Sequence, residues 1–134
     1  MVKVDVCNLK YVNSIRILSV DDHPRYREGI AALLAAHPDM NLVAQASNGQ
    51  EGINLFRTHR PDVTLIDLRL RDMSGIDTAA AIRTEFPEAR IIILTTFDSE
   101  TERKRALAAG VSAFVIKGAS PRKLMEAIQQ VHAG

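Results

Sequence analysis

The stretch IRILSVDDHP, residues 15–24, contains the pattern that decides the fold. Its first six residues are mostly apolar and rich in β-branched side chains, which predicts a buried strand. Two adjacent carboxylates, Asp21 and Asp22, follow at once, although like charges repel and burial disfavours them. Pro24 then suits the first turn of a helix. The stretch therefore predicts a strand and a helix joined by an acidic loop that needs a chemical explanation.

The same alternation of strand and helix continues along the chain. Apolar runs predict strands over residues 15–20, 41–46, 63–67, 91–95 and 112–117. Amphipathic runs predict helices over residues 24–36, 50–59, 76–86, 99–109 and from Pro121 onward. Pro87 and Gly110 end two of these helices, and Ser120 is expected to cap the last. Strict alternation with short connections predicts an α/β fold: a flavodoxin-like, doubly wound, five-stranded parallel sheet of order 2-1-3-4-5 with helices on both faces.

Length, charge and cysteine content limit the classes of function. The 134 residues suit one domain, residues 15–134, preceded by an extension over residues 1–14. A net charge of +1 gives no electrostatic argument for binding nucleic acid or a membrane. Cys7 is the single cysteine, and no signal peptide or membrane-spanning run is present in the sequence, so we expect a cytoplasmic protein. The sequence stops where the last helix would be ending, which is expected both for a domain cut from a longer protein and for a complete single-domain protein.

Polar side chains stand where the predicted strands end. Asp21 and Asp22 follow the first strand, and Asp67, Thr95 and Lys117 end the third, fourth and fifth. Each alone has an ordinary explanation: a helix cap, a turn residue, a strand former or a solvated lysine. Together they converge, because ligands in open parallel sheets bind outside the carboxyl ends of the strands. We therefore expect three carboxylates, a hydroxyl and an ammonium group in one site.

The chemistry of this set is that of a cation and a phosphoryl group. Clustered carboxylates repel one another unless a cation joins them, and a set of oxygen ligands suits Mg²⁺. An aspartate can accept a phosphoryl group to form an aspartyl phosphate. The ammonium of Lys117 and the hydroxyl of Thr95 would then contact the phosphoryl oxygens.

These residues and their surroundings resemble a two-component response regulator receiver domain of the NarL/FixJ subfamily. The motifs are VDDHPRYREGI, DVTLIDLRLRDMSGID, IIILTTFD and GVSAFVIKGA, and the resemblance covers residues 15–134. It implies that Asp67 accepts a phosphoryl group from a sensor histidine kinase. It also implies that Mg²⁺ is held by Asp21, Asp22, Asp67 and the backbone carbonyl of Arg69.

The resemblance further implies a switch and a regulatory output. Thr95 would move toward the phosphoryl group, and Phe114 would rotate into the space behind it. The surface formed by residues 99–109, the fifth strand and the last helix would change shape. This surface or another helical face would form a homodimer, although the mixed charges of residues 99–109 equally suit a solvated helix. The subfamily usually carries a C-terminal helix-turn-helix domain that controls transcription, and DNA would be bound only through that domain, which these residues do not contain.

The sequence departs from the pattern of its relatives at two positions. Many relatives have proline where this chain has Arg71, so the loop after Asp67 is expected to be less rigid. Most receivers outside the subfamily have proline after the lysine, and Gly118 leaves that loop freer.

Three other functions compete with this interpretation. One is a degenerate receiver that binds proteins without phosphorylation. Another is a Mg²⁺-dependent phosphatase or phosphotransferase, but Arg69 stands where a second acid is usual, and the nearest acid is Asp72. The third is a flavin or nucleotide module, which Asp21 and Asp22 would disfavour by repelling phosphate, and no G-x-G-x-x-G is present. We therefore expect a phosphoacceptor signalling domain that assists its own phosphorylation and dephosphorylation.

Overall fold

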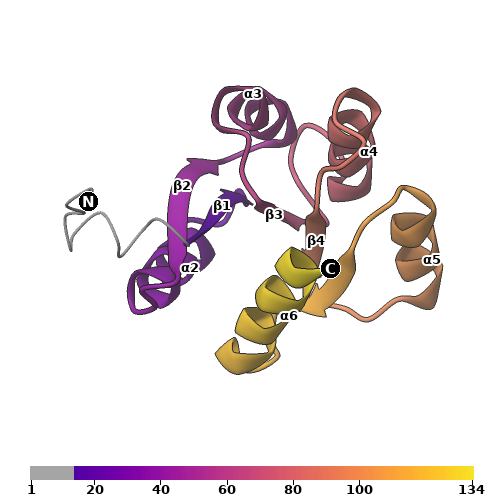
Figure 1. Cartoon of the computed structure of the whole chain (residues 1–134). Helices are drawn as coiled ribbons and strands as arrows, with labels where there is room; N and C mark the ends of the chain where they lie inside the picture. The colour runs from indigo at the N-terminus through magenta and orange to yellow at the C-terminus, as the bar shows by residue number, and fades with distance from the viewer. Residues whose placement is uncertain (1–13) are drawn as a thin grey trace.

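A computed structural model describes residues 14–134, so most of the extension predicted over residues 1–14 lies outside the described residues. Five strands alternate with five helices in the described part of the chain (Figure 1). The strands are β1 (Ile15–Val20), β2 (Met40–Ala46), β3 (Val63–Asp67), β4 (Ile91–Thr95) and β5 (Ala113–Ile116). The helices are α2 (Pro24–Ala35), α3 (Gly49–His59), α4 (Gly75–Glu85), α5 (Glu100–Ala108) and α6 (Pro121–Ala133).

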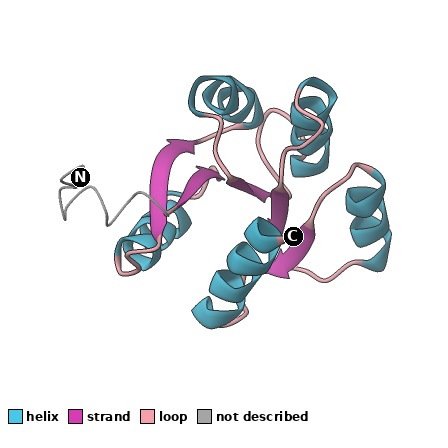
Figure 2. Cartoon of the chain, in the orientation of Figure 1, coloured by secondary structure: helices cyan, strands magenta, loops and turns pink. Residues whose placement is uncertain are grey.

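The strands form one parallel sheet in the order β2-β1-β3-β4-β5, which confirms the predicted topology. Helices α3 and α4 cover one face, and α2 and α6 cover the other (Figure 2). In this order β1 and β3 are neighbours at the point where the winding direction reverses. Their carboxyl ends therefore open next to each other, and this is the edge at which the polar residues were predicted to meet.

Two hydrophobic clusters, one on each side of the sheet, hold the layers together. The first joins the sheet to α3, α4 and α5 through side chains such as Phe56, Ile82 and Ala106. The second joins it to α2 and α6 through side chains such as Leu34 and Ile128. All five residues of β3 and of β4 are buried, as expected for central strands covered on both faces. None of the helices in residues 14–134 is long and apolar enough to cross a membrane.

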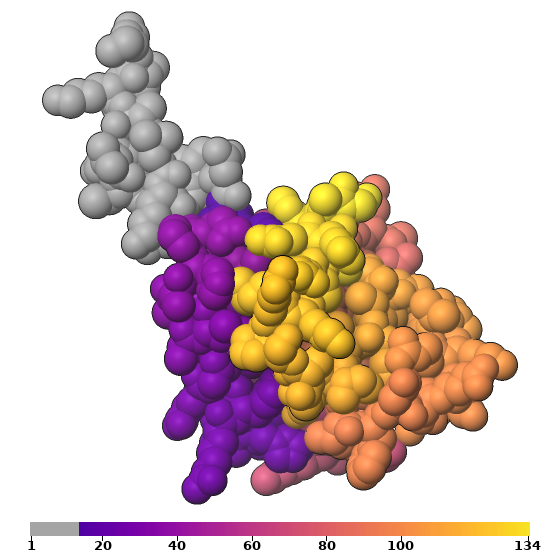
Figure 3. Space-filling view, turned by 90° about the horizontal axis from the view of Figure 1, so that it is seen from below, coloured from indigo at the N-terminus to yellow at the C-terminus, as the bar shows by residue number. Residues whose placement is uncertain are grey.

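The last helix lies against the second face, between the segment that contains α2 and the segment that contains α5 (Figure 3). Gly110 ends the preceding helix with a φ of 86°, as predicted for a glycine that terminates a helix. Ser120 occupies the N-cap position of α6, but its side chain makes no capping hydrogen bond, so that part of the prediction is wrong. The N–H of Lys123, which a capping side chain would accept, instead donates to the backbone carbonyl of Ser120 at 3.0 Å.

Candidate functional site

The acidic site lies where the chain leaves β1 and β3. Asp21 and Asp22 follow directly after β1, and Asp67 is the last residue of β3. Asp21 and Asp67 are buried, with 1% and 4% of their surface exposed. One carboxylate oxygen from each of the three aspartates lies within 4.8 Å of the others. The predicted convergence of these carboxylates is therefore present in the structure.

Lys117 brings a positive charge to the same place from the end of β5. Its Nζ lies 2.7 Å from Asp21 Oδ2 and 3.4 Å from Asp67 Oδ2. Only 9% of the Lys117 side chain is exposed, so little water screens these contacts. One ammonium group does not neutralise three carboxylates, and the site retains an excess of negative charge.

The environment of Asp67 disfavours its charged form. Burial raises the pKa of the Asp67 carboxyl above its ordinary value, the Lys117 ammonium lowers it, and the Asp21 charge raises it again, with a net increase. Asp67 Oδ2 and Asp22 Oδ1 are buried and make no hydrogen bond in the structure. Two buried oxygen atoms that accept no hydrogen bond, in a site with excess negative charge, fit a small divalent cation that prefers oxygen ligands, such as Mg²⁺.

His23 is a residue of this site to which the sequence analysis gave no role. Its Nδ1 lies 3.0 Å from Asp21 Oδ1, 3.2 Å from Asp22 Oδ1 and 3.3 Å from Asp67 Oδ2. The ring thus contacts all three carboxylates while 64% of the side chain remains exposed. The only signal in the sequence was its position directly after the acidic pair, at the same end of the strand.

Thr95 lies at the site but does not contact the carboxylates by hydrogen bonding. Together with Asp22, Asp67, Arg69 and Lys117, it lines a cavity of about 270 Å³. Its hydroxyl donates to the carbonyl of Phe97 at 3.2 Å and accepts from the Phe97 N–H at 3.3 Å. In this structure the hydroxyl is therefore held by the loop that leads to α5.

Phe114 lies outside this cavity, on the side of the sheet that faces α5. It is half-buried and packs against the first hydrophobic cluster. The guanidinium carbon of Arg103, on α5, lies 4.9 Å from the centre of its ring. The ring is therefore packed against the helix whose surface the switch was predicted to change.

The loop between β3 and α4 is anchored at both ends. A Cβ atom at Gly75 would overlap the carbonyl oxygen of Asp67, so this close approach requires glycine. The carboxylate of Asp72 accepts hydrogen bonds from the N–H groups of Gly49 and Gln50 at 2.8 and 2.9 Å, at the start of α3. Asp72 therefore binds a helix terminus and is not a second acid of the site.

The two basic residues of this loop also contact acids. Arg71 Nε lies 3.7 Å from Asp22 Oδ2, and Arg69 Nη2 lies 3.1 Å from Glu102 on α5. The loop is thus connected both to the acidic site and to α5, although it lacks the proline of many relatives.

Comparison with known proteins supports the assignment that this geometry suggests. The family profile described as "Response regulator receiver domain" matches residues 17–129. The chain belongs to the response regulator receiver domain family.

Similar proteins place this receiver domain among regulators of the NarL type. It is 34% identical over 122 residues to the nitrate/nitrite response regulator protein homolog of Haemophilus influenzae, covering 91% of this chain and 59% of that protein. It is 35% identical over 118 residues to the nitrate/nitrite response regulator protein NarL of Escherichia coli, covering 88% of this chain and 55% of that protein. The chain thus spans less than two thirds of either relative.

The fold agrees with solved receiver structures. The signal receiver domain of the putative response regulator NarL from Mycobacterium tuberculosis superposes with a TM-score of 0.87 at 30% identity. The match covers 91% of this chain and 98% of that structure. The receiver fold of a NarL-type two-component response regulator is therefore established for this chain.

Proposed function

We propose that this receiver domain accepts a phosphoryl group on Asp67 from a sensor histidine kinase. The observation that carries the proposal is the Lys117 ammonium, which lies within 3.4 Å of a buried Asp67 oxygen that accepts no hydrogen bond. That oxygen is the nucleophile, and it forms a bond to phosphorus while the bond from phosphorus to the donor breaks. The electron pair of the broken bond leaves with the donor.

The side chains around Asp67 have separate roles in this reaction. Lys117 neutralises charge on one phosphoryl oxygen after it leaves its contact with Asp21. Thr95 exchanges its hydrogen bond to the carbonyl of Phe97 for one to another phosphoryl oxygen. Both side chains need to move only a short distance, because Asp67, Thr95 and Lys117 line the same cavity.

The acidic pair and the loop after β3 hold the metal ion. Asp21, Asp22 and Asp67 provide carboxylate oxygens, and the backbone carbonyl of Arg69 is the remaining protein ligand that we propose. Mg²⁺ held by these residues would supply positive charge that offsets the charge of the entering phosphoryl group. The charge excess of the three carboxylates supports this assignment, since a cation relieves the repulsion between them.

The output of phosphorylation is a change of surface. The phosphoryl group adds roughly 1.5 to 2 negative charges and three acceptor oxygens. As Thr95 leaves the loop that it holds, Phe114 turns toward the vacated space and its packing against Arg103 changes. We propose that the altered surface of α5, β5 and α6 controls dimerisation and a DNA-binding domain attached to the same protein, which regulates transcription.

Intact-mass analysis tests the phosphoacceptor directly. The protein is incubated with acetyl phosphate, in Mg²⁺ or in chelator, and compared with Asp67→Asn. Asp62→Asn is the matched control, because Asp62 also adjoins β3 but its carboxylate accepts from the N–H of Arg16, outside the acidic site. We expect one phosphoryl adduct that requires Mg²⁺ and Asp67 and is retained in Asp62→Asn.

A stable analogue distinguishes rapid hydrolysis from a degenerate receiver. If no adduct forms but beryllium fluoride binds with Mg²⁺, the aspartyl phosphate is short-lived and the proposal stands. If neither acetyl phosphate nor beryllium fluoride reacts with the wild type, the domain binds partners without phosphorylation and the proposal is wrong.

A further inference from the structure

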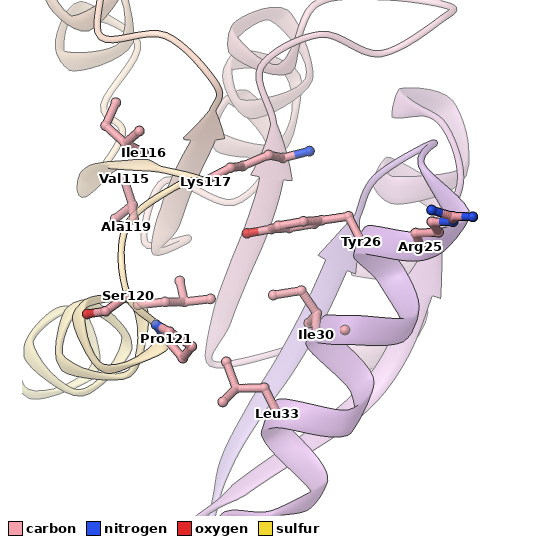
Figure 4. Close-up of a pocket in the computed structure, with 12 residues that line it drawn as sticks. Arg25, Tyr26, Ile30, Leu33, Val115, Ile116, Lys117, Ala119, Ser120 and Pro121 are labelled. Atoms are coloured by element: carbon pink, nitrogen blue, oxygen red, sulfur yellow. The ribbon is translucent and has the colours of Figure 1, made fainter.

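Tyr26 lies in the first turn of α2, between the acidic site and a cavity. The cavity has a volume of about 230 Å³ and lies between α2 and the connection from β5 to α6 (Figure 4). Tyr26 and Lys117 both line it, and the end of the Lys117 side chain extends over the face of the tyrosine ring (Figure 4).

The geometry is that of a cation–π contact. Lys117 Nζ lies 4.1 Å from the centre of the Tyr26 ring, well within the range in which the face of an aromatic ring attracts an ammonium group. The same Nζ lies 2.7 Å from Asp21 and 3.4 Å from Asp67. The ammonium is thus held by carboxylates at the ends of β1 and β3 and by an aromatic ring from α2.

We propose that Tyr26 is a positioning residue that holds the Lys117 ammonium at the phosphoacceptor site through the face of its ring. The inference rests on the proposed function, because it concerns the lysine that contacts the phosphoryl group. When Lys117 leaves Asp21 for a phosphoryl oxygen, it loses one of its two carboxylate contacts. The ring limits the other directions in which the ammonium can move and replaces water that would compete for it.

The ring, and not the hydroxyl, carries this role. Burial, together with the negative charges of Asp21 and Asp67, raises the pKa of Tyr26 to about 12, so the phenol stays neutral near pH 7. Figure 4 shows the hydroxyl end directed across the cavity, away from the Lys117 ammonium. Phenylalanine at position 26 should therefore preserve the contact with Lys117, because it keeps the ring. Leucine fills similar space but has no electron-rich ring face.

The experiment compares Tyr26→Phe and Tyr26→Leu in the whole chain. The first measurement is the affinity for beryllium fluoride at saturating Mg²⁺, which is monitored through the ¹⁹F signal of the bound anion. We expect Tyr26→Leu to bind the anion about 3- to 10-fold more weakly, and Tyr26→Phe to match the wild type. The affinity for Mg²⁺ alone should not change in either variant, because we place neither Lys117 nor Tyr26 among the metal ligands.

Two further measurements separate positioning from general loss of structure. Leu33→Ala enlarges the same cavity, which Leu33 also lines, and should lower stability while preserving the affinity for the anion. The ε-methylene protons of Lys117 should resonate upfield of those of the other lysines, because they lie over the ring face. We expect this upfield shift in the wild type and Tyr26→Phe, and its loss in Tyr26→Leu.

Several outcomes would overturn the inference: equal anion affinity in Tyr26→Leu and the wild type, a Tyr26→Phe variant as weak as Tyr26→Leu, or parallel loss of Mg²⁺ and anion affinity. Failure of the proposed function looks different. The wild type would then bind no anion, while the upfield shift of Lys117 would still report whether the ring holds the ammonium.

Discussion

Replacing Asp67 with asparagine should stabilise the metal-free protein, because the side chain is held in an environment that disfavours its charge. At an effective dielectric constant of about 20, the attraction to Lys117 at 3.4 Å is about 5 kcal/mol. Repulsion from Asp21 and Asp22, at separations of up to 4.8 Å, is about 3 to 4 kcal/mol from each. The net repulsion is about 2 kcal/mol, and asparagine removes it while keeping the shape of the side chain.

The expected result is a higher Tm for Asp67→Asn in chelator. A gain of about 2 kcal/mol corresponds to an increase of about 5 to 10 °C in a domain of this size. The measurement is thermal unfolding by circular dichroism, with Asp62→Asn as the control. That control should lower the Tm, because it weakens the acceptor of the hydrogen bond from the N–H of Arg16.

The pH dependence of the difference follows from the direction of the pKa shift. The pKa of Asp67 in the folded protein is raised above its ordinary value of 3.8, so ionisation of this group lowers the stability of the wild type. This loss of stability is absent at pH values below the ordinary pKa of 3.8. It grows as the pH rises from there through the raised pKa of the folded protein, and it is complete above the raised pKa. The advantage of Asp67→Asn should therefore be largest near pH 7 and fade toward pH 3, and Mg²⁺ should reduce it. Equal or lower stability of Asp67→Asn in chelator at pH 7 would refute the reasoning.

Three other perturbations test separate parts of the site. Asp72→Asn removes the charge that binds the start of α3, and urea unfolding should show a loss of about 0.5 to 1 kcal/mol, whereas an unchanged midpoint would contradict the contact. His23→Ala removes the ring that contacts all three carboxylates, so calorimetric titration should show roughly fivefold tighter Mg²⁺ binding, and weaker binding would make the ring a ligand instead. Beryllium fluoride with Mg²⁺ should convert monomers into dimers in sedimentation velocity, and a constant mass would exclude dimerisation driven by phosphorylation in this chain.

The features that could be predicted from the sequence are those that local patterns of apolar and polar residues determine. β1, β3 and β4 begin and end at the predicted residues, because buried parallel strands are continuous apolar runs with clear polar ends. The predicted helix ends differ from the observed ones by at most one residue. The strand order came from the alternation of strands and helices together with the known behaviour of doubly wound sheets.

The site was predictable as a set of residues but less so as a set of contacts. The ends of the strands placed Asp21, Asp67 and Lys117 together without any structural knowledge beyond the order of the sheet. The contact of Tyr26 with Lys117 joins residues separated by most of the chain, and it depends on where the first turn of α2 lies relative to β5. No local pattern contains that information.

Asp72 is a second residue whose contact could not be predicted from local sequence patterns. The sequence identified it only as the nearest acid after Asp67, and the structure shows that it caps the start of α3. Capping is usually recognised from residues next to a helix in the sequence. This acceptor comes from a loop more than twenty residues away, so the pattern of residues around Gly49 does not reveal it.

The alternation of side chains along β5 connects the end of this strand to both faces of the sheet. Phe114 projects to the side packed by α5, whereas Val115 packs on the side of α2 and α6, where Lys117 meets Tyr26. On the function proposed above, a change at Asp67 that moved Thr95 would reach the first side, and one that moved Lys117 would reach the second. Two partners on opposite faces of the sheet would then respond to one modification without competing for the same surface.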